Sequence, residues 1–585
     1  MASNTTAGPA AVPFTITLPL LPAITPTTIT SSPILLATLL LTLLTTLLLT
    51  RSSGPRLHPL EPPLLRPHLP LIGHILSLIR HQAAYHITLQ KHTRRPIATL
   101  PMLWSGKLYA VWDPYLAAAG LRAKTLSTTP HILEVTPTAC ETGEVTNGVL
   151  RGGTGEVLVE RMMERVIPGA LKGEGMRGMN LVALGGLGGS LSSLAVAAAK
   201  GNGNGDGWTE VPNLWLFIRH LVTSATTTAL YGPEHNPFSV DAGSEDALWT
   251  MERNLLGLTL GLPGFMTKAG RQARATLVGA LRPFYVGHRD TGGLEVGEKQ
   301  EGTKGGVSQF VRDRAGLLRE SGIPDEDVAK LEIMLPFAAM ANTVPLLFWL
   351  IGWVFEMQGK VGADGQGDVV ERLRKEVEGL IVGREGDVVR LSVATSAVEQ
   401  NCPLLMSCYK ETQRKTVHQV STRTVVEDTI LRDRAGKEYL LKKGNVAQLV
   451  LGTGHNMEEY WGEDVDEFKP DRFVTGSNSS NGQASKTEDG PGSVRAMRAA
   501  FLPFGGGSHL CPGRAFAFAE MMAVMATLLL GFDVQPLEGS EWKVPEFATR
   551  SVIDAVTKPK NHGDGLGVKL RRRSGWENAQ WKYEL

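Results

Sequence analysis

Cysteine is scarce in this chain. Only four cysteines occur in 585 residues, and no two of them have the CxxC spacing. This scarcity argues against a zinc site and a disulfide scaffold, and it suits a domain that faces a reducing cytosol. Charge of one sign is also lacking, since 59 basic and 58 acidic residues give a net charge of +1. The balance gives no reason to expect nucleic acid or another polyanion as a partner. The cysteines are Cys140, Cys402, Cys408 and Cys511.

The first fifty residues contain no Lys, Arg, Asp or Glu. Within them, Ile34 to Leu49 is almost entirely Leu, Ile, Ala and Thr, and with its flanks this run is long enough to cross a bilayer. A cleavable signal peptide would begin with a basic region, which is missing, so the pattern favours an uncleaved anchor over a signal peptide. Arg51, Arg56 and Arg66 follow, and the positive-inside rule places the rest of the chain in the cytosol.

We therefore predict a lumenal tail over residues 1–33 and a transmembrane anchor over 34–50. Asn4 begins an Asn-Thr-Thr sequence that would be a lumenal glycosylation sequon. Residues 51–73 form a proline-rich hinge, whose prolines favour an extended path and would hold the following body at a fixed attitude on the membrane. The prolines are Pro55, Pro59, Pro62, Pro63, Pro67 and Pro70.

Three polar, glycine-rich tracts are predicted to be surface insertions. They are Lys200–Gly207, Thr291–Gly306 and Gly476–Gly492. The first looks like a phosphate-binding loop. No strand precedes it and no Lys-Ser or Lys-Thr follows, so that interpretation is set aside.

Cys511 lies in a glycine-rich loop, Phe504 to Arg514, with the sequence FGGGSHLCPGR. An apolar helix is predicted from this loop to about Leu530, with Pro512 at its first position. The amides and dipole of a helix N-terminus favour a thiolate. Three consecutive glycines let a large flat ligand approach closely. A lone anionic sulfur of this kind is the axial ligand that favours O–O cleavage at haem iron. The alternative is a buried structural cysteine beside a flexible loop.

The loop resembles FxxGxxxCxG, the haem-binding signature of the cytochrome P450 family, at Phe504, Gly507, Cys511 and Gly513. The resemblance implies a mainly α fold with small β-sheets, over one catalytic domain from residue 74 to 585. Length alone would predict two or more domains. The resemblance also implies haem b as cofactor, with Cys511 as the metal ligand.

Two further motifs appear in the family's order. Glu411 and Arg414 have the ExxR spacing on a helix that begins at Pro403, and the segment Phe468 to Phe473 resembles the PERF motif with Asp in place of Glu. The resemblance implies that Arg472 joins Glu411 and Arg414 in a buried network behind the haem. We interpret these three residues as structural. Alone, such a pair is more often a solvated salt bridge.

Haem carries two propionates that need cations in the protein. The resemblance places Arg423 and His509 at a propionate clamp, although each also fits a solvated position. Arg423 begins a predicted hairpin that turns at 433–436 and ends near Val450. Between this hairpin and the PERF-like segment, His455 and Trp461 serve only to fix the register of the resemblance.

The longest predicted helix runs from Glu326 to Met357 and is kinked by Pro336 and Pro345. Residues 338–343, with the sequence AAMANT, resemble the family's (A/G)Gx(D/E)T pattern. Thr343 is present, but Asn342 replaces the acid and Met340 replaces the glycine. Asparagine cannot ionise, so a proton relay here would need water or Thr343 alone. The alternative is a buried polar pair that satisfies a helix break.

The AxANTxP pattern resembles the branch of the family that includes sterol hydroxylases and prostacyclin synthase, and fungal members of specialised metabolism. It implies an endoplasmic-reticulum monooxygenase that hydroxylates a sterol, terpenoid or other lipophilic molecule. Electrons would come from NADPH through NADPH-cytochrome P450 reductase. Thr343 would hold the oxygen and its proton network, and Asn342 would orient water.

Two alternatives to this function stay open. One is a reductase-independent isomerase or dehydratase, which Asn342 favours. The other is a non-catalytic haem-binding protein. Three cations, Lys410, Lys415 and Arg514, would form a basic face for a flavoprotein, or would simply be solubilising charge.

Overall fold

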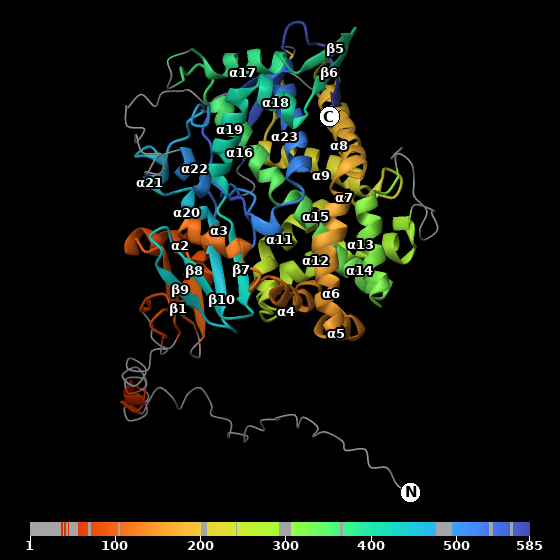
Figure 1. Cartoon of the computed structure of the whole chain (residues 1–585). Coiled ribbons are helices and arrows are strands. Elements are labelled where there is room, and N and C mark those ends of the chain that lie inside the picture. The colour runs from red at the N-terminus through yellow and green to blue at the C-terminus, as the bar shows by residue number, and fades with distance from the viewer. Residues whose placement is uncertain are drawn as a thin grey trace.

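A computed structural model gives the structure of the chain (Figure 1). It describes residues 57–67, 72–102, 106–199, 207–241, 243–291, 306–362, 365, 367–474, 494–537, 542–561 and 565–585, and in the predicted anchor residues 37, 38, 40–42 and 45. Most of the predicted tail and anchor, and the greater part of the three predicted insertions, therefore lie outside the described residues.

Helices form most of the described protein, as predicted, and the sheet with β1, β7 and β10 lies at the opposite end from the sheet with β5 and β6 (Figure 1). The helices are α2 (Ile75–Thr93), α3 (Pro114–Arg122), α4 (Thr129–Cys140), α5 (Glu144–Arg151), α6 (Gly153–Arg161), the π-helix η3 (Met162–Val166), α7 (Ile167–Ala170), α8 (Gly173–Ala199), α9 (Leu214–Tyr231), α10 (Pro237–Val240), α11 (Ser244–Thr259), α12 (Lys268–Val286), η4 (Arg289–Thr291), α13 (Gln309–Glu320), α14 (Asp325–Glu332), α15 (Met334–Met340), α16 (Thr343–Glu356), α17 (Val369–Glu378), α18 (Thr395–Asn401), α19 (Pro403–Thr416), α20 (Leu451–Gly454), α21 (Glu458–Trp461), α22 (Val494–Ala500), η5 (Gly507–His509) and α23 (Arg514–Gly531).

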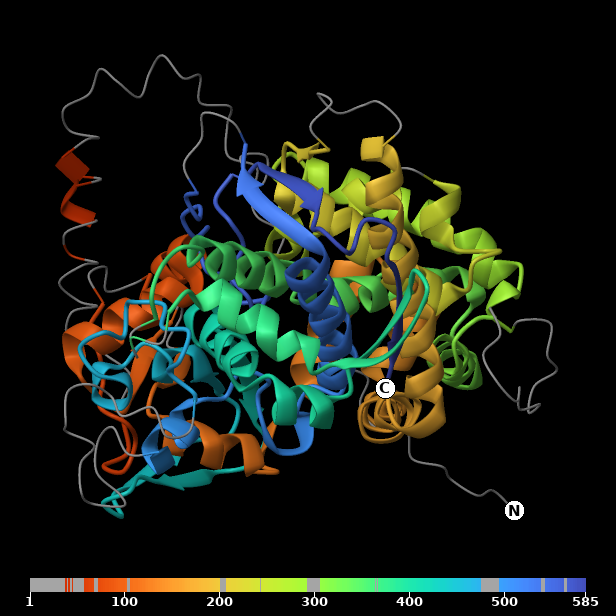
Figure 2. The same cartoon turned by 90° about the horizontal axis from the view of Figure 1, so that it is seen from above.

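Helix α23 runs through the middle of the helical part, with α8 on one side and α16 and α17 on the other (Figure 2). Its residues from Phe518 to Gly531 are all buried, because nearly every position is Ala, Met, Val, Leu or Phe. The loop that carries Cys511 therefore leads directly into a helix that core packing holds in place.

Strands make up four small sheets. The largest has the order β1-β2-β10-β7-β3, in which β10 is parallel to β2 and the other pairs are antiparallel. The strands are β1 (Ile97–Pro101), β2 (Lys107–Val111), β3 (Leu126–Ser127), β4 (Thr209–Val211), β5 (Ile381–Glu385), β6 (Val388–Ser392), β7 (Val420–Val425), β8 (Thr429–Arg432), β9 (Glu438–Leu441), β10 (Val446–Val450), β11 (Phe532–Pro536), β12 (Val568–Arg572) and β13 (Gln580–Glu584).

The hairpin predicted from Arg423 to Val450 is two nested hairpins. Strands β7 and β10 pair in the large sheet, while β8 and β9 form a separate two-stranded sheet whose turn covers 433–436, as predicted. The short turn joins β8 to β9, the inner pair. In the outer pair, β10 also pairs in parallel with β2 of the large sheet.

Helix ends follow local sequence signals. Asp113 caps α3 by accepting a hydrogen bond from the Leu116 amide, with Pro114 at the first helical position. Asn213 caps α9 in the same way through the Leu216 amide. These caps matter to the site because α3 supports the Cys511 loop and α9 packs on α15 and α16.

The described part of the hinge lies along the large sheet. Leu64 pairs with Thr99 in parallel fashion, and Glu61 forms a salt bridge of 3.0 Å with Lys107. These contacts agree with the predicted extended path. At the end of the hinge Gly73 has a φ of 67°, and a Cβ there would lie 2.2 Å from the carbonyl oxygen of Pro101, so only glycine fits.

The predicted kinked helix is three helices, α14, α15 and α16. It is interrupted near Ile333 and at Ala341–Asn342. Pro336 and Pro345 cannot donate to the carbonyls of Glu332 and Ala341, so each break lies three or four residues before a proline.

Two described stretches are long and apolar enough to cross a bilayer. They are Asp325–Glu356 and Arg514–Gly531, whose most apolar windows are 72% and 83% buried inside the protein. Both are therefore explained as core helices.

Candidate active site

Cys511 is the one cysteine of the four that is partly exposed. Its amide donates to the carbonyl of Phe504 at 3.0 Å, which closes the loop. Helix α23 begins at Arg514 with Gly513 as its N-cap, so the prediction that Pro512 is the first helical residue is two positions early. The sulfur faces the amides of Gly513 and Arg514.

The loop is braced by the C-terminal end of α3. Gly507 has a φ of 65°, and a Cβ there would lie 2.3 Å from the carbonyl oxygen of Leu121. Gly506 faces the Leu121 side chain. Gly506 and Gly507 thus allow the loop backbone to approach the end of α3 closely. A Cβ at Gly513, by contrast, would meet nothing within 4 Å.

Burial raises the pKa of the Cys511 thiol above its ordinary value. The amides of Gly513 and Arg514 and the charge of Arg514 lower it by less. The amides at the start of the helix thus favour a thiolate, as predicted, but burial outweighs them when no cation is bound. The sulfur needs a bound cation to deprotonate, because a coordinating metal removes a thiol proton outright.

Arg423 and His509 lie close together, as predicted. The charge of Arg423 adds to burial in lowering the pKa of His509. The Arg423 side chain is 2% exposed, and its Nε donates to the Ser421 hydroxyl at 3.1 Å. No carboxylate in the described part of the chain forms an ion pair with it, and burial alone lowers its pKa. A buried cation without an anion is costly, so this position fits an anionic group such as a haem propionate.

The predicted network around Glu411 is confirmed. Its carboxylate binds Arg414 through two bonds of 2.8 Å and Arg472 through one of 2.9 Å, and Glu411 and Arg414 are fully buried. Arg414 also donates to the carbonyls of His455 and Val465. The network therefore fastens α19 to the 455–472 segment.

His455 was expected only to fix the register, but it has a structural role. Its Nδ1 donates to the Val417 carbonyl at 2.9 Å, and its Nε2 accepts from the Leu502 amide at 3.1 Å. Burial lowers its pKa to about 4, so the ring is neutral and suited to this donor–acceptor pair. His455 thus links the end of α19 to the start of the Cys511 loop.

Asn342 and Thr343 lie at the break between α15 and α16. The Thr343 hydroxyl donates to the Ala339 carbonyl at 3.1 Å and so provides a hydrogen-bond donor for one carbonyl next to the break. The Asn342 Oδ1 accepts from the amides of Ala555 and Val556 at 3.0 and 3.1 Å. Asn342 therefore fixes the 551–558 segment to the central helix. Ala338, one turn earlier on α15, is exposed.

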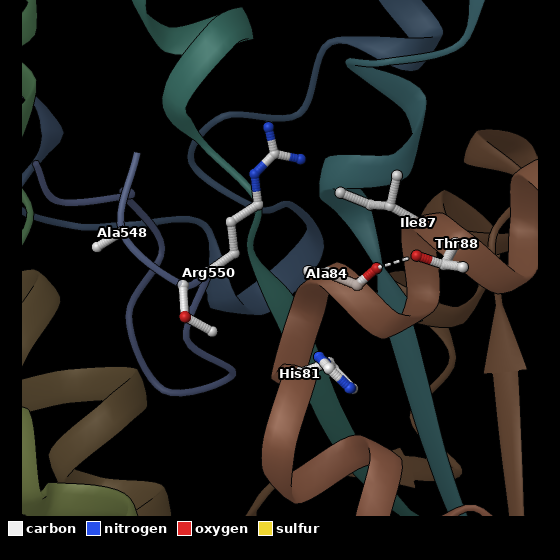
Figure 3. A pocket seen from close by; sticks show the side chains of 7 residues that line it. His81, Ala84, Ile87, Thr88, Ala548 and Arg550 are labelled. Carbon is white, nitrogen blue, oxygen red and sulfur yellow. Dashed lines mark hydrogen bonds between the residues drawn. The ribbon is translucent and has the colours of Figure 1, made fainter. Parts of the chain in front are cut away.

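A separate cavity of about 340 Å³ lies between α2 and residues 548–550 (Figure 3). His81, Ala84 and Thr88 line one side, and the Arg550 guanidinium points away from His81. None of the lining residues belongs to the Cys511 loop or to the α15–α16 break, so this cavity is distinct from the candidate active site.

Comparison with known proteins decides the family. The cytochrome P450 family model matches residues 260–562. A cytochrome P450 monooxygenase of Gibberella zeae is 33% identical over 540 residues, which cover 91% of this chain and 93% of the relative. The chain belongs to the cytochrome P450 family. It is a P450 monooxygenase, an oxidoreductase.

Other P450 relatives span fungi and mammals. Cytochrome P450 monooxygenase nodJ of Hypoxylon pulicicidum is 28% identical over 90% of this chain and 93% of its own length. The human 7-alpha-hydroxycholest-4-en-3-one 12-alpha-hydroxylase is 25% identical over 41% of this chain and 45% of its own length. The resemblance to fungal and sterol-hydroxylase members is thus confirmed. P450 enzymes bind haem b through a cysteine thiolate and use NADPH-derived electrons through a reductase.

Helix α23 carries a buried acid that sequence reasoning missed. Glu520 is fully buried and accepts from the Thr226 hydroxyl of α9 at 2.7 Å. Burial raises its pKa to about 8, and the Thr226 hydrogen bond opposes this only in part. In the sequence, only its place among the apolar residues of α23 could have indicated that this acid is buried.

We expect Glu520 to make stability fall as pH rises. The folded pKa is above the ordinary value of 4.5, so its contribution is intact below pH 4.5 and is lost as pH rises to about 8. The loss reaches roughly 4 to 5 kcal/mol at most. Urea unfolding of Glu520→Gln between pH 5 and 8 should show a flatter pH dependence than the parent. A slope equal to the parent's would refute this assignment.

Proposed function

We propose that this protein is a membrane-anchored P450 monooxygenase that hydroxylates a lipophilic small molecule with O2. Its electrons would come from NADPH through NADPH-cytochrome P450 reductase. The observation that supports the site assignment is the partly exposed Cys511, with the buried cation Arg423 close to His509 and without a carboxylate partner among the described residues.

In this proposal Cys511 holds the haem iron, and Arg423 and His509 hold the propionates. Phe504 closes the loop through its carbonyl, Gly507 lets the loop pack on α3, and Gly513 is the N-cap of α23. Thiolate-bound haem supplies the O–O cleavage chemistry.

Thr343 is proposed to hold a proton at its hydroxyl beside the reacting oxygen. Asn342 has its Oδ1 committed to two amides, so only its Nδ2 would orient water. Because Asn342 cannot ionise, the proton would arrive through water or Thr343.

The substrate is proposed to be a sterol, terpenoid or other apolar metabolite of the endoplasmic-reticulum membrane. Residues 34–50 would anchor the chain there once, with residues 1–33 in the lumen, the 51–73 hinge next and the 74–585 catalytic domain in the cytosol. The sequence supports this through its uncharged apolar run followed by arginines. An apolar substrate concentrates in the bilayer, where an anchored enzyme can reach it.

Reconstitution of the full chain with the reductase in lipid vesicles tests the proposal. We expect oxygen consumption and product formation that require NADPH and a lipid extract. Turnover without NADPH would instead indicate an isomerase or dehydratase. A haem protein that binds carbon monoxide but never consumes oxygen would be a non-catalytic binding protein.

Replacing Arg423 tests the propionate clamp. We expect Arg423→Met to lose haem more readily than the parent, because the substitution removes the cation that would pair with a haem propionate. The haem-free variant should nevertheless unfold at higher urea than haem-free parent, because an unpaired buried cation is gone.

Arg414→Met is the matched control, since that arginine is already paired. It should destabilise the protein with and without haem. If Arg423→Met behaves like Arg414→Met, Arg423 is not a propionate ligand.

A further inference from the structure

The cavity of about 340 Å³ between α2 and residues 548–550 has the size of a small-molecule site (Figure 3). Such sites commonly measure about 300 to 1,000 Å³. Neither the haem assignment nor the oxygen chemistry uses the residues around it. Its lining is part apolar and part polar, and includes His81, Ala84, Ile87, Thr549 and Arg550.

The backbone of α2 is strained beside the cavity. Gln82 has a φ of 48° and a ψ of −129° inside the helix, a conformation that a residue with a side chain rarely adopts. Two contacts hold it there. The Gln82 Oε1 accepts from the Val552 amide at 3.1 Å, and the Ala83 amide donates to the Arg550 carbonyl at 3.0 Å. Strain of this kind persists only where surrounding contacts fix it, so the shape of the cavity is set by the fold.

Arg550 is a largely buried cation on the wall of the cavity. Burial lowers the pKa of its guanidinium, and Asp466 is the acid whose charge opposes this shift. No carboxylate among the described residues forms an ion pair with it. The ring of Phe547 lies 5.8 Å from the guanidinium carbon, and a ring face compensates a desolvated cation only in part. Arg550 therefore has room for an anionic partner.

The charges around Arg550 also favour an anion. Burial, with the charge of Arg550 added to it, lowers the pKa values of His418 and His455 to about 4, so both rings are neutral. Lys415 feels the charge of Arg550 as well, and Asp466 acts on both cations. One carboxylate thus faces two cations, and a buried cation without an anion is costly.

We propose that this cavity binds the phosphate group of a small anion, with Arg550 as its main ligand. A guanidinium presents parallel N–H donors that match two phosphate oxygens. The Thr549 hydroxyl is a further donor from the adjoining residue. Ala84 and Ile87 keep the α2 wall partly apolar, which suits a phosphate carried on carbon. Two sources supply this group, the headgroup of an anionic lipid and a soluble phosphate.

Calorimetric titration of the haem-loaded full chain in a neutral detergent tests the site. The probes are inorganic phosphate and dihexanoyl phosphatidylglycerol, a short-chain anionic lipid. We expect Arg550→Gln to weaken binding about tenfold or more, because a charge-assisted hydrogen bond is lost. Ala84→Leu keeps every charge but fills the cavity from α2, and it should weaken binding to a similar extent.

Arg80→Gln is the matched control. Arg80 lies on the same helix, is exposed and does not line the cavity, so its replacement removes an equal charge from the neighbouring surface. This variant should bind both probes as the parent does. A reduced carbon monoxide spectrum equal to that of the parent shows that each variant is folded and holds haem.

The outcomes decide both the site and the source of its ligand. Tighter binding of the lipid supports a lipid headgroup, and binding of inorganic phosphate at least as tight supports a soluble phosphate. If neither probe binds the parent, or if either cavity variant binds like the parent, the inference is wrong. An equal loss in Arg80→Gln and Arg550→Gln would mean that the probes respond to general surface charge, which also refutes it. The proposed monooxygenase function stands in every case.

Discussion

Replacing Cys511 with alanine is expected to abolish both the thiolate spectrum and the oxidation. The other three cysteines are buried in the core, so no second thiol is placed to substitute for it. The reduced carbon monoxide complex should lose the red-shifted Soret band that a thiolate ligand produces, and NADPH-dependent product should fall to background. Absorption spectra and turnover of the purified variant measure both.

Cys140→Ala is the matched control, because it also removes one thiol but from a buried position at the end of α4. It should keep the spectrum and cost only modest stability. An unchanged carbon monoxide spectrum in Cys511→Ala would disprove the assignment of Cys511 as the metal ligand, and the propionate clamp would lose its support.

The sequence predicted those parts of the site that short motifs encode. The Cys511 loop spans eleven residues, and its glycines and proline mark the turn whatever surrounds it. Glu411 and Arg414 are one helical turn apart, so their pairing follows from spacing alone. The third member, Arg472, came from the family resemblance, because nothing local links it to a helix about sixty residues earlier.

Contacts between distant segments could not be predicted in the same way. Asn342 was expected to orient water, and nothing in the sequence indicated that its Oδ1 accepts from amides 213 and 214 residues further along the chain. The Glu252–Lys558 contact spans 306 residues. No local pattern encodes such pairs, since they depend on how the helices stack around α15 and α16.

The sign of the Cys511 pKa shift was also beyond the sequence. The motif shows the amides that stabilise a thiolate, but it does not show how deeply the sulfur is buried. Burial outweighs the amides here. The breaks of the central helix, by contrast, were readable from its two prolines, although the division into three separate helices was not.

Replacing Glu411 with glutamine is expected to be the most destabilising single change outside the cysteine loop. The amide keeps the shape of the carboxyl but removes the charge that Arg414 and Arg472 share. The fully buried Arg414 then has no carboxylate partner among the described residues, while Arg472 keeps only its salt bridge with Asp464. Breaking a buried pair costs about 3 to 5 kcal/mol. We expect little haem to be incorporated during expression, and urea unfolding should show the loss of stability.

The exposed pair between Arg282 and Glu326 supplies the control, because it is also bidentate but lies in solvent. Glu326→Gln should change the urea midpoint too little to resolve. If the loss in Glu411→Gln comes from a stranded cation, adding Arg414→Met should restore part of the stability, because the buried cation without a carboxylate is then gone. A double variant as unstable as the sum of the two single variants would mean that the carboxyl shape, not its charge, holds α19 to the 455–472 segment.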